Sequence, residues 1–124
     1  MENYTSKDLF QMEPEQLIRY LNQLCKVEIP KTVETVEDMQ EAANILARLG
    51  PLYAFLSNME MTANVQKRML KKNKEQKEQY EEAITREYIF GSYGEQVKML
   101  YQTVSRLLTI KSQINQELKM LGDA

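Results

Sequence analysis

Residues 92–122 decide the fold, and their sequence is SYGEQVKMLYQTVSRLLTIKSQINQELKMLG. Apolar residues and one lysine recur here at alternating steps of three and four: Val97, Leu100, Val104, Leu107, Lys111, Ile114, Leu118 and Leu121. This heptad spacing is typical of helices that pack side by side, and such a seam needs a partner surface along its length. Ser92 and Glu95 fit a capping box at the start of the helix, and Gly122 fits its end. The stretch predicts a C-terminal helix over residues 91–124.

The composition of the 124-residue chain indicates one helical domain. Hydrophobic residues make up 43% of it, whereas glycine (four) and proline (three) are scarce, a balance that favours helices around a single core. No run approaches the ~20 apolar residues of a membrane span, and the start of the chain lacks a signal-peptide pattern. We therefore expect an all-α, cytoplasmic protein without membrane contact. Its single cysteine, Cys25, is expected to be a buried and unreactive side chain.

Residues 1–34 predict a short N-terminal helical unit and a linker. Thr5 and Asp8 fit a cap on one helical turn, and Pro14 fits the first turn of a second helix. The second helix has one apolar face, and the linker at residues 27–34 follows it because a proline there disfavours helix. We expect this unit to dock as a lid on the rest of the chain.

Residues 35–90 predict a long helix that ends in a tight turn. Thr35 fits its cap, and the apolar stripe continues across Pro51, so we expect a kink there rather than a stop. Two glycines around a serine at residues 91–94 are typical of an αα-hairpin turn. The sequence thus predicts a long kinked helix, a turn, and an antiparallel helix over 91–124, packed as in a coiled coil.

A hairpin folded about Gly91 has a mismatch in its middle. The polar run of residues 71–79 would lie beside three apolar seam residues. If these side chains stayed exposed to water, the protein would lose a burial free energy of about 1.5–3 kcal/mol for each. Either the first helix of the same chain or a second copy of the protein must cover them. We predict self-association as a symmetric dimer, with the charged seam position specifying register. The residues assigned to this seam are Val104, Leu107, Leu108 and Lys111.

The residue types that carry most protein chemistry are missing from the chain. Without histidine, and with one cysteine, it cannot assemble a zinc site of the usual nitrogen and sulfur kind. Acidic clusters sit on highly charged helix faces, which indicates solvated surface, and no phosphate-binding loop or nucleophile elbow occurs. We therefore predict that the protein is not an enzyme and binds no metal and no cofactor.

Six basic residues concentrate within residues 67–77, opposed only by Glu75. Three interpretations are open. The run is a solvated helix face, or it follows the phosphates of a nucleic acid, or it contacts an acidic protein surface. On a continuous helix, three of its lysines would share one stripe. The candidate binding residues are Lys67, Arg68, Lys71, Lys72, Lys74 and Lys77.

A second cluster combines aromatic and basic residues around the predicted turn. Tyrosine and arginine beside an apolar patch are typical of a binding hot spot at the tip of the hairpin. The alternative is a hydrophobic plug that closes the end of the hairpin. The residues assigned to this partner-binding tip are Arg86, Tyr88, Phe90, Tyr93 and Lys98.

The run of residues 101–111, YQTVSRLLTIK, preceded by LYAFL at residues 52–56, resembles small helical proteins of bacteriophages and prophages. The resemblance covers about residues 45–120. It implies a bacterial cytoplasm and an accessory or anti-defence role, and it assigns no functional residue.

Two functions follow as hypotheses. The first is a non-enzymatic helical interaction protein, phage-encoded as the resemblance implies, that binds and modulates a protein complex such as a host nuclease-based defence system. The second is a nucleic-acid-binding accessory protein of phage replication or recombination, which would use the basic residues on phosphates. A purely structural oligomer is a third.

Overall fold

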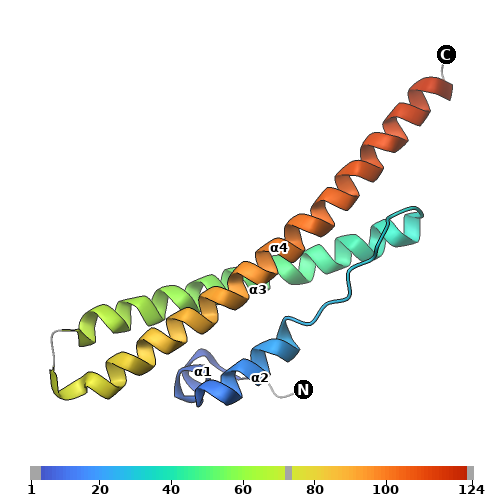
Figure 1. Ribbon diagram of the computed structural model, residues 1–124. Coiled ribbons are helices and arrows are strands. Elements are labelled where there is room, and N and C mark those ends of the chain that lie inside the picture. Colours follow the sequence, from blue (N-terminus) through green and yellow to red (C-terminus); the bar gives the residue numbers. More distant parts are fainter. Residues whose placement is uncertain (1–3, 72–73, 123–124) are drawn as a thin grey trace.

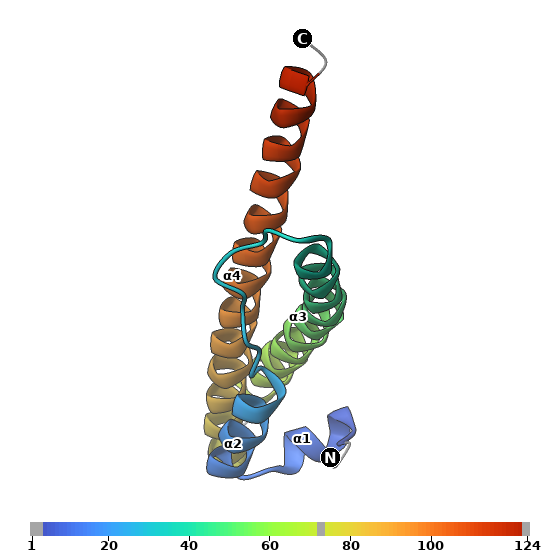
Figure 2. The ribbon, with the colours of Figure 1, turned by 90° about the vertical axis from the view of Figure 1, so that its right-hand side faces the viewer.

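The computed structural model describes residues 4–71 and 74–122, and every regular element in these ranges is a helix (Figure 1). The elements in chain order are α1 (Ser6–Gln11), α2 (Pro14–Leu24), α3 (Val36–Leu70), the short 3-10 helix η1 (Lys74–Gln76) and α4 (Lys77–Gly122). α3 and α4 form an antiparallel hairpin, the two N-terminal helices lie against one side of it, and α4 projects beyond the start of α3 (Figures 1 and 2). The predicted all-α helical hairpin is thus confirmed.

The hairpin reverses direction between Leu70, where α3 ends, and Lys77, where α4 begins. The predicted turn at residues 91–94, and with it the division into helices over 35–90 and 91–124, is wrong. The reversal falls inside the run that has no apolar side chain. A chain that leaves the helix in such a run forfeits no apolar burial, so the turn costs least there.

Gly91 and Gly94 lie inside α4, at a point where this helix passes close to α3. A Cβ atom on Gly91 would overlap the Glu60 carboxylate, and one on Gly94 would lie 3.8 Å from Leu56 Cβ. None of the described glycines has a positive φ, so neither a hairpin turn nor a left-handed stop at Gly122 is formed. The capping box predicted beside these glycines is not formed either, because it lies inside the helix. The glycines serve close helix packing.

Both capping boxes predicted nearer the N-terminus are formed. The Thr35 hydroxyl accepts from the Asp38 N–H at 3.0 Å, and the Asp38 carboxylate accepts from the Thr35 N–H at 3.1 Å. Thr5 and Asp8 make the same pair of bonds at 3.2 and 2.9 Å. The backbone N–H donors hold the pKa of both aspartate carboxyl groups below its usual value. Short-range polar signals therefore placed these two helix starts correctly.

α3 continues through Pro51 without a break, as predicted. Leu49 lies before the proline and Leu56 and Met59 after it, and all three side chains are buried. A proline inside a helix costs about 3 kcal/mol, because it removes a hydrogen bond and crowds the preceding turn. Packing of the apolar stripe on both sides of Pro51 offsets that cost.

The main core joins the N-terminal helices to the hairpin. Leu9 of α1 and Leu17 and Leu21 of α2 are fully buried against the hairpin. The helices α1 and α2 therefore supply part of this core, whereas the sequence predicts that the N-terminal unit docks as a separate lid. The other buried members of the cluster are Met12, Cys25, Leu49, Leu56, Met59, Ile89, Phe90, Tyr93 and Val97.

Replacing Gly94 by alanine is expected to stabilise the protein by about 0.5–1 kcal/mol. Alanine is more favourable than glycine inside a helix by this amount, and the added Cβ makes only ordinary contact with Leu56. Thermal unfolding followed by circular dichroism measures the change as a rise in melting temperature. A left-handed turn at Gly94 predicts the opposite sign, so a marked loss of stability would contradict a continuous α4.

Candidate interaction site

The residues assigned to a dimer seam are covered largely by their own chain. Val104 is fully buried against the linker and the first turns of α3, and Leu107 and Leu108 are half-buried in the same cluster. Lys111 is half-buried, and its charge helps to lower the pKa of Asp38. The predicted mismatch with the polar run is wrong, because the turn lies elsewhere and brings the start of α3 against this part of α4.

Exposed apolar side chains lie further along α4, where it projects beyond α3 (Figure 1). Ile110, Ile114, Leu118 and Leu121 are exposed by 52%, 47%, 59% and 72%, respectively. About the last three turns of α4 therefore leave their apolar side chains without a partner within the described chain.

Three of the five residues assigned to the aromatic tip hold the N-terminal helices. Phe90 is fully buried, and the Tyr93 hydroxyl donates a hydrogen bond to the Asn22 side chain. Arg86 donates to the Met12 carbonyl oxygen at 3.3 Å. The predicted partner-binding tip is wrong at these positions, because they lie in the middle of the molecule and face its core.

The other two tip residues point elsewhere on α4. Tyr88 is 76% exposed, and Lys98 is exposed as well. Tyr88 and Phe90 are two residues apart, which places them on nearly opposite faces of a helix with 3.6 residues per turn. The five residues therefore form neither a single patch nor a plug at the end of the hairpin.

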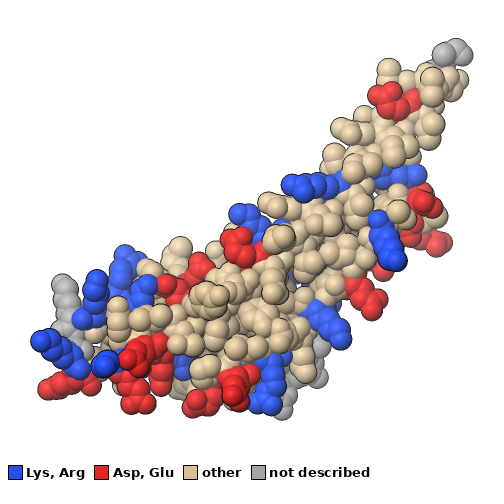
Figure 3. Space-filling model, viewed as in Figure 1, with Lys and Arg blue, Asp and Glu red and all other residues tan. Residues whose placement is uncertain are grey.

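The true end of the hairpin carries the basic run. Lys71 follows the last residue of α3, Lys74 begins η1, and Lys77 begins α4. All three are exposed, and together with Leu70 and Tyr80 they line a cavity of about 350 Å³. Lysine and arginine side chains gather at this end of the molecule, with glutamates beside them (Figure 3). The basic run thus forms a compact patch, here called the basic turn and defined by Lys71, Lys74 and Lys77.

The remaining basic residues divide between other surroundings. Lys67 donates to Glu87 Oε1 at 2.8 Å, which links α3 to α4. Arg68 is exposed on α3, and Lys72 lies outside the described residues. The predicted helical stripe is wrong, because the helix ends at Leu70 before the stripe can continue.

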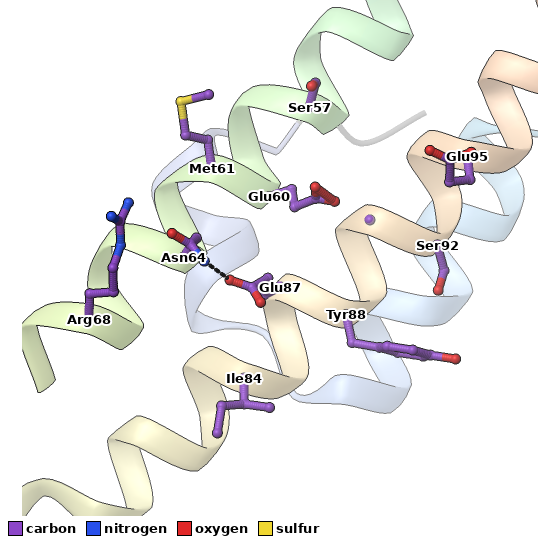
Figure 4. A pocket seen from close by; sticks show the side chains of 11 residues that line it. Ser57, Glu60, Met61, Asn64, Arg68, Ile84, Glu87, Tyr88, Ser92 and Glu95 are labelled. Atoms are coloured by element: carbon purple, nitrogen blue, oxygen red, sulfur yellow. Dashed lines mark hydrogen bonds between the residues drawn. The ribbon is translucent and has the colours of Figure 1, made fainter. Parts of the chain in front are cut away.

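A groove that the sequence did not predict lies between α3 and α4 on the face away from the N-terminal helices. Its volume is about 870 Å³, and Met61, Ile84 and Tyr88 supply exposed apolar surface along it. Figure 4 shows Glu60 and Glu87 pointing from the two helices into the space between them. The lining residues lie far apart in the sequence, so only the register of the two helices brings them together.

Glu87 is the polar centre of this groove. It accepts a hydrogen bond from Asn64 Nδ2 at 2.6 Å (Figure 4). It also accepts one from Lys67 at 2.8 Å. These two donors hold the pKa of the Glu87 carboxyl below its usual value. The contribution of the pair to stability is therefore present at neutral pH and is lost as the pH falls through this lowered pKa.

The described residues contain neither a reactive thiol nor a cluster of metal ligands. Burial raises the pKa of the Cys25 thiol to about 11, so the thiol is protonated at neutral pH and is a poor nucleophile. No group of three or more histidine, cysteine, aspartate or glutamate side chains lies close enough to hold a metal within residues 4–71 and 74–122. None of the helices described is long and apolar enough to cross a membrane.

Comparison of the chain with protein-family models, with curated proteins and with solved structures found no match. The resemblance to small phage proteins is therefore untested by these comparisons and stays a prediction.

Phe90→Ala and Tyr88→Ala are expected to have very different effects. Truncating the fully buried Phe90 removes apolar contacts and leaves a cavity, which costs about 3–5 kcal/mol, whereas the exposed Tyr88 costs less than about 0.5 kcal/mol. Chemical denaturation of both variants measures these free energies of unfolding. Equal, small losses in the two variants would contradict the packing of the N-terminal helices on Phe90.

Proposed function

We propose that the protein is a non-enzymatic helical interaction protein that binds an acidic surface of a protein partner through its basic turn. The observation that supports this proposal is the gathering of three exposed lysines around a cavity at one end of the hairpin. Leu70 and Tyr80 border the same cavity, so the patch offers apolar contact beside charge. Tyrosine is enriched in protein-binding hot spots, and exposed lysines around it attract an acidic partner surface.

The shape of the basic turn favours a protein over a nucleic acid. A helix that tracks a nucleic acid presents its cations in a row along the phosphates. Here the chain reverses after Leu70, so Lys71, Lys74 and Lys77 surround one point instead. Nucleic-acid binding is therefore the alternative that the same experiment tests.

The resemblance of residues 45–120 to phage proteins extends this proposal. In that setting the partner would be a protein complex of the bacterial host, such as a nuclease-based defence system, and binding would modulate it. This extension depends on the resemblance alone.

The basic turn is tested with two fluorescent polyanions, a poly-glutamate peptide and a single-stranded DNA of similar charge. We expect the peptide to bind at about 50 mM salt and to weaken at about 200 mM salt, because exposed charges are screened. Reversing Lys71, Lys74 and Lys77 to glutamate is expected to lower the affinity by about tenfold or more. Fluorescence anisotropy measures each titration.

The matched control reverses Lys7, Lys26 and Lys31, which are exposed and lie far from the turn in the sequence. Both triple variants change the net charge equally, so a loss of affinity confined to the first identifies the basic turn as the binding surface. Equal losses in both variants, or no peptide binding at low salt, would refute the proposal. Tighter binding of DNA than of peptide at equal salt would support the nucleic-acid alternative instead.

A further inference from the structure

The projecting end of α4 continues a line of apolar residues that is buried within the chain over its earlier part. From Phe90 through Val97 to Val104, residues seven apart are fully buried against the rest of the chain. The same spacing continues to Lys111 and Leu118, but α3 begins near Asp38 and does not extend along this last part of α4. Several apolar side chains therefore follow an established interface into solvent.

The same chain offers a surface that fits such a helix. The groove between α3 and α4 has apolar walls at Met61, Ile84 and Tyr88. A second cavity of about 330 Å³, lined in part by Tyr53 and Tyr101, continues along the hairpin about one helical turn further on. Both cavities lie between α3 and α4, one after the other along the hairpin. A helix that docks in a groove of this kind is a common mode of recognition.

We propose that two copies of the chain pair antiparallel, so that the projecting end of α4 of each copy lies in the α3–α4 groove of the other. This interface is independent of the basic turn, which lies at the end of the hairpin. It is isologous, because each copy supplies both a projecting helix and a groove.

The spacing of apolar side chains on α4 fits this register. Ile84 and Tyr88 are one helical turn apart, and so are Ile114 and Leu118. When Tyr88 faces Ile114 of the second copy, Ile84 faces Leu118 of the second copy. Every one of these side chains is exposed in the single chain, so the pairing covers apolar surface without disturbing the core.

The same register also brings two opposite charges together. Glu95 falls opposite Arg106 of the second copy, and both residues are exposed in the single chain. Two-fold symmetry repeats this pair, so one dimer contains it twice.

Charge favours the groove over a parallel pairing of the projecting ends. The groove carries Glu60, Glu95 and Arg68, Glu87 is paired with Lys67, and Lys98 lines the second cavity, so this face is close to neutral. The projecting helix carries Arg106, Lys111 and Lys119 against Glu117. A parallel pairing would set Lys111 against Lys111 of the second copy and leave both grooves empty.

Sedimentation velocity over a range of protein concentrations tests the dimer on the full chain. We expect a reversible dimer that the double variant Ile114→Ser with Leu118→Ser weakens by about tenfold or more, because both side chains enter the groove. Met120→Ser is the control, since Met120 is at least as exposed as the two test residues but lies off the stripe. A monomer at all concentrations, or equal weakening by the control, would overturn the proposal.

Charge exchange tests the register directly. Glu95→Arg and Arg106→Glu are each expected to weaken the dimer by about fivefold, and the double variant is expected to restore it, because the pair is re-formed with its charges exchanged. Both positions are exposed, so folding is not at risk. Failure of the double variant to recover would overturn this register.

Cross-linking separates antiparallel from parallel pairing. Within one chain, positions 88 and 114 are about 39 Å apart along α4, so a disulfide between them can form only between two copies. We expect mild oxidation of a Tyr88→Cys, Ile114→Cys variant to give a dimer whose cross-link joins position 88 to position 114, as assigned by peptide mapping. Efficient cross-linking of Ile114→Cys alone would indicate parallel pairing and overturn the proposal.

Discussion

Burial of one continuous face of α4 is the interaction on which the rest of the structure depends. Phe90, Val97 and Val104 on this face are fully buried, and α3, the linker and the N-terminal helices all pack against it. α4 spans 46 residues, whereas α3 spans 35 and α2 only 11. No single helix can therefore cover α4. The N-terminal helices, α3 and the linker each cover a different part of it, and the apolar side chains of its last turns stay exposed.

The local signals in the sequence predicted helix starts well and the reversal of the chain poorly. Thr35 with Asp38 forms the predicted cap, because a capping box depends only on residues within one turn. Gly91 and Gly94 were misread as a turn. Glycine is favoured both in a left-handed turn and where two helices approach closely, and the sequence alone does not distinguish these two roles. Which use applies is decided by the partner helix.

The candidate surfaces were predictable only in part for the same reason. The basic run was found by composition, but its shape changed from a stripe to a compact patch once the chain reversed after Leu70. The groove was missed, because Met61 and Tyr88 lie side by side only when the register of α3 against α4 is known. The tip residues were grouped by proximity in sequence, although positions 88 and 90 face opposite sides of the helix.

The packing along the hairpin is stronger in its middle than toward its turn. In the middle, large side chains from the N-terminal helices complete the core. Toward the turn, the buried contacts are made by the small residues Ala63 and Ala83, and a partly exposed pair between Lys67 and Glu87 links the helices. Such a pair contributes about 1 kcal/mol or less. The turn end is therefore held less firmly than the middle, so the binding proposed for the basic turn would disturb the core little.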